Sequence, residues 1–151
     1  MEVTVSGLGL DPVWLPNQRH SSTVHHANDI VIVEGKLYAP HCNGGGLVAL
    51  TAAVDDSVFV SPTAIVRDFA QLRDHVRLLN SAVVEGHAVI SGNCELRKNA
   101  CVGDRAELSD CVLVTGNARV GGRSKLSGCL NIGYFAYIGE GSRISGTLMI
   151  E

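Results

Sequence analysis

Aromatic side chains and charges are both scarce in this 151-residue chain. Phe, Tyr and Trp make up 5% of the residues and Asp, Glu, Lys and Arg 18%, although the hydrophobic fraction reaches 46%. The formal net charge of −3 comes from scattered residues, so the chain lacks the basic patch that nucleic acid or an anionic membrane selects. We expect one domain of small, closely packed side chains, with neither nucleic acid nor membrane among its partners.

Two further absences bear on localisation. No basic segment followed by an apolar run opens the chain, and no stretch approaches the roughly 18 apolar residues that span a bilayer. The five cysteines form an odd set without a CxxC pair, which fits reduced thiols better than a disulfide framework. The sequence therefore predicts a cytoplasmic protein without an export signal.

What the chain has in abundance is a six-residue repeat. An aliphatic residue occupies every sixth position from Val48 to Ile150, in 18 of 18 cases. Two residues earlier stands a second series, mostly Ala or Ser, and both series point inward because residues two apart share a strand face. Larger residues interrupt the second series once every 18 residues, so three hexads form one coil; they are Val58, Val76, Cys94, Val112, Leu130 and Leu148.

Turn-forming residues, mostly Gly and Asp, follow many of the aliphatic positions, as at Gly86, Gly92, Asp104 and Asp110. They mark the corners of a triangular coil with three flat sides. The repeat predicts an all-β triangular solenoid with nearly six coils over residues 46–151, roughly 28 Å long at about 4.8 Å per coil. No segment has the 3.6-residue pattern of a helix.

Residues 1–45 do not follow the repeat. Residues 2–10 and 29–38 have the composition of strands, and the second segment turns back at Glu34-Gly35-Lys36. We expect residues 1–45 to form an N-terminal β-hairpin cap on the solenoid of residues 46–151, because an uncovered first coil would expose apolar residues and an unpaired strand edge.

Three stretches, Val102 to Glu107, Val120 to Lys125 and Ile138 to Arg143, resemble the repeat of the bacterial transferase hexapeptide superfamily. The resemblance covers about residues 46–151 and implies a left-handed parallel β-helix. Residues 45–48 and 86–93 are also similar to a poorly characterised branch of bacterial and phage repeat proteins. That branch implies no particular activity.

Many members of the superfamily are trimeric acyltransferases that use acetyl-CoA or an acyl carrier, with a histidine as general base. The resemblance makes His87 the candidate base, and Arg105 and Arg123, on the same corner, the candidate ligands of the CoA phosphates. Other members resemble γ-class carbonic anhydrases, whose metal is held by three histidines. His75 and His87 fall on different corners, so we expect no metal site of that kind.

Two functions remain open at this stage. The hexads run without an inserted loop that could roof an acceptor site, and no C-terminal helix follows them. This favours a non-catalytic structural or interaction module that forms homo-oligomers. The alternative is a hexapeptide acyltransferase that transfers an acyl group from acetyl-CoA or another acyl-CoA to an amine or hydroxyl acceptor.

Two smaller clusters also have competing interpretations. Cys111 and Cys129 share a corner one coil apart, where two thiols could form a redox or metal pair; without a close third ligand, small corner-filling residues are the simpler interpretation. His25-His26 and His41-Cys42 could meet in the cap, although surface histidines are the simpler expectation there.

Two surfaces are predicted to contact other subunits. Leu148 and Ile150 keep both inward series in phase up to the penultimate residue, which leaves an open apolar edge. We expect a second copy to cover this edge across a two-fold axis, with the N-terminal segment of a neighbouring subunit as the second choice. A further subunit or cap contact is predicted on the outward row of Ile65, Val83, Cys101 and Tyr137.

Overall fold

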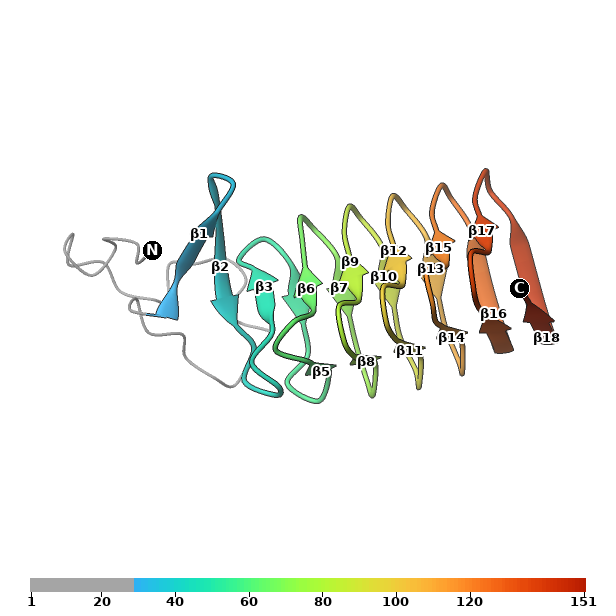
Figure 1. Ribbon diagram of the computed structural model, residues 1–151, viewed down its shortest axis with the longest axis horizontal. Helices are drawn as coiled ribbons and strands as arrows, with labels where there is room; N and C mark the ends of the chain where they lie inside the picture. The colour runs from blue at the N-terminus through green and yellow to red at the C-terminus, as the bar shows by residue number, and fades with distance from the viewer. Residues whose placement is uncertain (1–28) are drawn as a thin grey trace.

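The computed structural model describes residues 29–151 and shows an elongated β-solenoid of stacked coils (Figure 1). All eighteen regular elements in this range are strands. Most strands have two residues and are separated by four-residue corners, so each coil of 18 residues contributes three strands. The predicted all-β solenoid of 18-residue coils is therefore confirmed. None of residues 29–151 belongs to a helix that could cross a membrane.

The strands stack in three parallel columns, with partners one coil apart. Cys101, for example, pairs with Val83 in the preceding coil and Arg119 in the next. The first column contains β3 (Leu47–Ala49), β6 (Ile65–Val66), β9 (Val83–Val84), β12 (Cys101–Val102), β15 (Arg119–Val120) and β17 (Tyr137–Ile138).

The second and third columns join into one sheet at the C-terminal end. The second contains β4 (Ala53–Val54), β7 (Gln71–Leu72), β10 (Val89–Ile90) and β13 (Glu107–Leu108), and the third contains β5 (Phe59–Val60), β8 (Arg77–Leu78), β11 (Glu95–Leu96) and β14 (Leu113–Val114). The longer β16 (Lys125–Ile132) rounds a corner and pairs with both β13 and β14, and β18 (Arg143–Ile150) pairs with β16 along its whole length.

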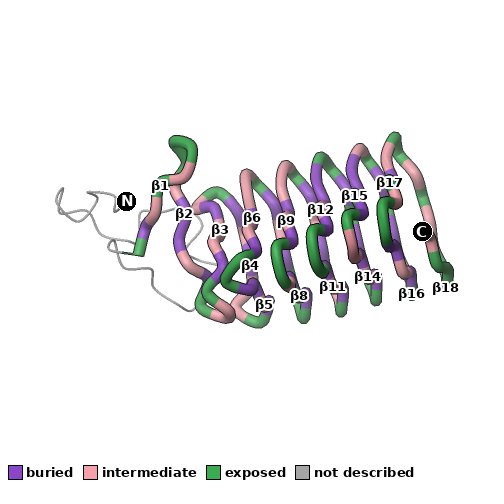
Figure 2. The backbone as a smooth tube through the Cα atoms, viewed as in Figure 1, coloured by how far each residue is buried: buried purple, intermediate pink, exposed green. Residues whose placement is uncertain are grey.

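The hydrophobic core fills the inside of the coils. From Val54 to Ile138, every aliphatic residue of the six-residue series is at most 6% exposed, as the inward assignment predicts (Figure 2). Ser124 replaces an alanine of the small series and is fully buried, but its hydroxyl donates a hydrogen bond to the Gly121 carbonyl at 2.6 Å. The core therefore tolerates this polar side chain, because its polar atom is satisfied.

The corners depend on left-handed backbone conformations. Every sixth residue from Asp68 to Gly146 has a positive φ, a conformation that Gly, Asn and Asp adopt more readily than other residues. Some of the aspartates also bind the next coil. Asp74 Oδ2 accepts a hydrogen bond from the Gly92 amide at 3.0 Å, and Asp110 Oδ2 accepts one from the Gly128 amide at 2.9 Å. A Cβ at Gly92 would lie 2.7 Å from the Asp110 carbonyl oxygen, so glycine suits this crowded corner.

An antiparallel hairpin covers the first column at its N-terminal end. Strands β1 (Val31–Val33) and β2 (Lys36–Pro40) pair across the predicted turn, where Glu34 and Gly35 have φ values of 52° and 76°. Positive φ at both central residues is typical of a type I′ hairpin turn. Strand β2 then pairs antiparallel with β3. The predicted strand at 2–10, like the remainder of the cap before Asp29, lies outside the described residues.

Further contacts close the first coil below the hairpin. The Val60 amide donates to the Asn43 carbonyl and the Val60 carbonyl accepts from the Gly46 amide, both at 3.0 Å. Lys36 Nζ lies 2.7 Å from Asp68 Oδ1, which connects the hairpin to a corner of the solenoid. The first coil is thus held by both backbone and side-chain contacts.

Candidate functional site

The row of the candidate base lies on one corner of the solenoid. Phe69, His87, Arg105 and Arg123 follow one another at intervals of one coil, and all four are exposed. The His87 ring stacks on Phe69, with the ring centroids 5.1 Å apart and the planes 7° apart. Within residues 29–151, the guanidinium groups of Arg105 and Arg123 have no hydrogen-bond or ion-pair partner. The row therefore presents one imidazole and two free cations to solvent.

The other histidines lie apart from this row. His75 is exposed on a different corner, as the spacing predicts. His41, expected at the surface, is only 6% exposed, because its Nε2 donates to the Val58 carbonyl at 2.9 Å at the end of the core. The structure thus corrects the surface assignment of His41. His25 and His26 lie outside the described residues, so the structure leaves their predicted cluster with His41 and Cys42 untested.

A groove of about 350 Å³ runs along the outer face of the first column. Its lining comes from neighbouring coils: Asp68, Glu85, Gly86, Cys101, Gly103, Asp104, Arg119, Val120, Gly121 and Tyr137. At two of its glycines, a side chain from a neighbouring corner or coil lies close to where a Cβ would be. A Cβ at Gly121 would lie 2.7 Å from Asp104 Oδ2, and one at Gly103 would lie 3.2 Å from Glu85 Cγ. Two of its residues, Cys101 and Tyr137, belong to the outward row predicted to contact another subunit. The candidate base His87 does not line the groove, although its neighbour Gly86 does.

The chemistry of the groove centres on a thiol and carboxylates. The Cys101 thiol donates to Glu85 Oε1 at 3.7 Å. Burial raises the pKa of Cys101, and the negative charge of Glu85 raises it further. Because a thiol with a raised pKa stays protonated at neutral pH, Cys101 is a poor nucleophile. Sequence reasoning placed Cys101 and Tyr137 on one outward face together with Glu85 and Arg119, but it predicted no groove there and missed the corner residue Asp104.

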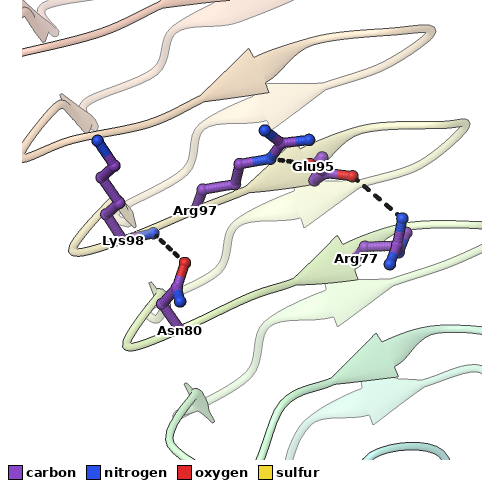
Figure 3. Close-up of polar contacts among 5 residues, drawn as sticks. All are labelled: Arg77, Asn80, Glu95, Arg97 and Lys98. Atoms are coloured by element: carbon purple, nitrogen blue, oxygen red, sulfur yellow. Dashed lines mark hydrogen bonds and ion pairs between the residues drawn. The ribbon is translucent and has the colours of Figure 1, made fainter.

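The third column carries a separate set of polar contacts (Figure 3). Glu95 lies between two arginines: its Oε2 is 3.4 Å from Arg77, and its Oε1 accepts from Arg97. On the nearby corner, Asn80 Oδ1 accepts from the Lys98 amide at 3.0 Å. Both arginine side chains are at least half exposed, so we expect these ion pairs to add little stability.

Within residues 29–151, the remaining cysteines do not build a metal site. Cys111 and Cys129 share a corner on neighbouring coils and are both exposed. Cys42 is exposed elsewhere, where its thiol donates to Asp56 Oδ1 at 3.5 Å. Among residues 29–151, no group of three or more His, Cys, Asp or Glu side chains is arranged to hold a metal ion.

The fold defines the class of protein to which the chain belongs, a parallel β-solenoid of about six turns with 18 residues per turn. This architecture is consistent with a hexapeptide-repeat β-helix. Comparison with protein-family models, with curated proteins and with solved structures finds no match in any of the three. The site therefore has to be interpreted from its own geometry.

Proposed function

We propose that this chain is a non-catalytic structural or interaction module of the hexapeptide-repeat type that assembles with a copy of itself. The observation that carries the proposal is the position of its exposed apolar side chains. Five of the seven large hydrophobic side chains exposed among residues 29–151 lie in residues 133–150, here called the terminal coil. They are Tyr134, Phe135, Tyr137, Leu148 and Met149.

For Leu148 the exposure follows from the lack of a further coil beyond the terminal coil among the described residues. Leu130 is 1% exposed and pairs with Leu148, which occupies the same position one coil later and is 50% exposed. Among the described residues, β18 pairs only with β16, so its other edge has free backbone N–H and C=O groups (Figure 1). An apolar surface beside an unpaired strand edge is a template for pairing with another chain.

A second copy related by a two-fold axis suits this edge best. Such an axis brings β18 of each copy together in antiparallel pairing and closes the assembly. Stacking in a filament would instead need a free edge at the other end of the solenoid. In the first column that edge is already paired, because β2 covers β3, so a filament could not continue all three columns; β4 and β5 are the edge strands of the sheet that contains β18. The outward row of Ile65, Val83, Cys101 and Tyr137 stays a proposed second contact.

Light scattering on the reduced protein at micromolar concentration tests the proposal. We expect a dimer or a higher even-numbered oligomer for the wild type, and dissociation or insolubility for the double variant Leu148→Asp/Ile150→Asp. Phe69→Asp is the matched control, because Phe69 is 53% exposed but lies on a side corner away from the terminal coil. A monomeric wild type, or equal dissociation in the control, would overturn the proposal.

The second candidate function is a hexapeptide acyltransferase. The observation that favours it is the row in which His87 stacks on Phe69 with the unpaired cations of Arg105 and Arg123 beyond it. In this function His87 is the general base and the two arginines bind the phosphates of acetyl-CoA. We rank it second because the row lies on an exposed corner and His87 does not line the groove. For either function we propose a cytoplasmic location, in keeping with five free cysteines.

A further inference from the structure

The register of the solenoid places Cys111 directly opposite Cys129. The strands on both sides of the corner pair at an offset of one coil, as in Leu108 with Leu126 and Leu113 with Asn131. Between them, the Cys111 amide donates to the Gly128 carbonyl at 3.0 Å. Neighbouring strands lie about 4.8 Å apart, and a disulfide requires Cα atoms roughly 4.4 to 6.8 Å apart. The backbone spacing therefore permits a bond between the two sulfur atoms.

The two thiols are accessible and interact with each other. Both side chains are exposed. The pKa of Cys111 is raised, first by partial desolvation and then by its interaction with the Cys129 thiol and by the charge of Asp110. Exchange at Cys111 should therefore speed up with rising pH, because the thiolate is the reactive form.

The other three cysteines provide internal references. Cys94 is buried, and burial raises its pKa to about 11. Cys101 is partly buried, and its thiol is hydrogen-bonded to the Glu85 carboxylate. Cys42 is also exposed, but its thiol is hydrogen-bonded to the Asp56 carboxylate. Cys111 and Cys129 thus combine exposure with a neighbouring thiol.

We propose that Cys111 and Cys129 form a reversible disulfide between neighbouring coils by exchange with a small-molecule disulfide. One cysteine thiolate attacks a sulfur of the small disulfide, forms a mixed disulfide and expels one small thiol. The second cysteine thiolate then attacks the protein sulfur of the mixed disulfide and expels the other small thiol. Two protein thiols are oxidised to one S–S bond, the small disulfide is reduced to two thiols, and these take up the two cysteine protons.

The disulfide links the coil of Cys111 to the next one, which in turn pairs with the terminal coil through β16 and β18. It constrains the unfolded chain by closing a loop, so oxidation stabilises these coils against unfolding. The bond is exposed and its geometry is set by strand spacing rather than by a flexible loop. Exposed or strained disulfides are the more easily reduced ones, and we therefore expect reversibility.

Treatment of the folded protein with oxidised glutathione tests the proposal. Cleavage after Lys and Arg places Cys111 in the peptide 106–119 and Cys129 in the peptide 126–143, while Cys42 falls in a third peptide, 37–67. We expect the first two peptides to be joined in the unreduced digest, with an intact mass lower by two hydrogens for this bond. Cys42 should instead carry glutathione. Dithiothreitol should separate the joined peptides again.

The variants Cys111→Ser and Cys129→Ser provide the controls. In each, the remaining cysteine of the pair should keep its glutathione, because no neighbouring thiol displaces it. Oxidation should raise the melting temperature of the wild type but of neither variant. The proposal is overturned if wild-type Cys111 and Cys129 stay reduced while Cys42 reacts, if each carries its own glutathione, or if the joined peptides come from two protein molecules. None of these outcomes depends on the proposed assembly.

Discussion

Enlargement of Ala100 tests the packing of the core most directly. Ala100 is fully buried, and the positions one coil before and after it are also alanines, Ala82 and Ala118, each fully buried. Leucine adds three carbons at a corner where both neighbouring coils also place a buried alanine. Overpacking of this kind costs about 1–3 kcal/mol. In a protein of this size, each kcal/mol lowers the melting temperature by roughly 2–4 °C.

A matched substitution at another corner separates size from position. Val112 belongs to the series of larger inward residues. The next member of that series, Leu130 one coil later, is 1% exposed. We expect Val112→Leu to cost less than Ala100→Leu, because this corner already accommodates a leucine. Glu107→Leu on the exposed side should change stability by no more than about 0.5 kcal/mol.

Thermal unfolding followed by circular dichroism measures these differences. Because each coil contacts only its neighbours, we also expect Ala100→Leu to speed up amide hydrogen exchange mainly in the coil of Ala100 and the two adjacent coils. Equal melting temperatures for Ala100→Leu, Val112→Leu and Glu107→Leu would refute the assignment of inward positions and of a narrow corner. Uniformly faster exchange along the whole chain would refute the local nature of the packing.

Two further predictions concern the hairpin contact and the candidate base. The pKa of Asp68 is lowered, first by its hydrogen bond with Lys36, so its contribution to stability is present above the unfolded pKa of about 4 and is lost as the pH falls through the lower folded value. Denaturant unfolding between neutral and acid pH should show a smaller loss of stability for Asp68→Asn than for the wild type, and identical pH profiles would contradict this assignment. For the candidate base, we expect no thermal shift with acetyl-CoA and no turnover with a simple amine, whereas a ligand at 100 times its dissociation constant would add about 2.7 kcal/mol. A clear shift that Arg105→Ala reduces, with turnover that His87→Ala abolishes, would replace the interaction module with an acyltransferase.

The six-residue repeat was enough to predict the solenoid, because an aliphatic residue at every sixth position matches one short inward-facing strand and one corner in each hexad. The 18-residue spacing of the larger inward residues also gave the size of a coil. The hairpin turn at Glu34 and Gly35 was predictable as well, since turn chemistry is local. These features depend on local turn chemistry and on the spacing of apolar residues. Both can be read directly from a sequence.

Side-chain contacts between coils were decided only by the tertiary structure. The groove combines Glu85, Cys101 and Arg119, whose separations of 16 and 18 residues bring them together only when the coils are stacked. His41 is a single residue outside the repeat. Nothing in its local sequence indicates that its ring is buried at the end of the core and hydrogen-bonded to the Val58 carbonyl. Spacing placed Cys111 and Cys129 on one corner, but the influence of the Cys129 thiol on the pKa of Cys111 depends on the directions in which the side chains point. The sequence therefore determined the coil and its register. The sites on its surface arise from contacts between residues that become neighbours only when the coils stack.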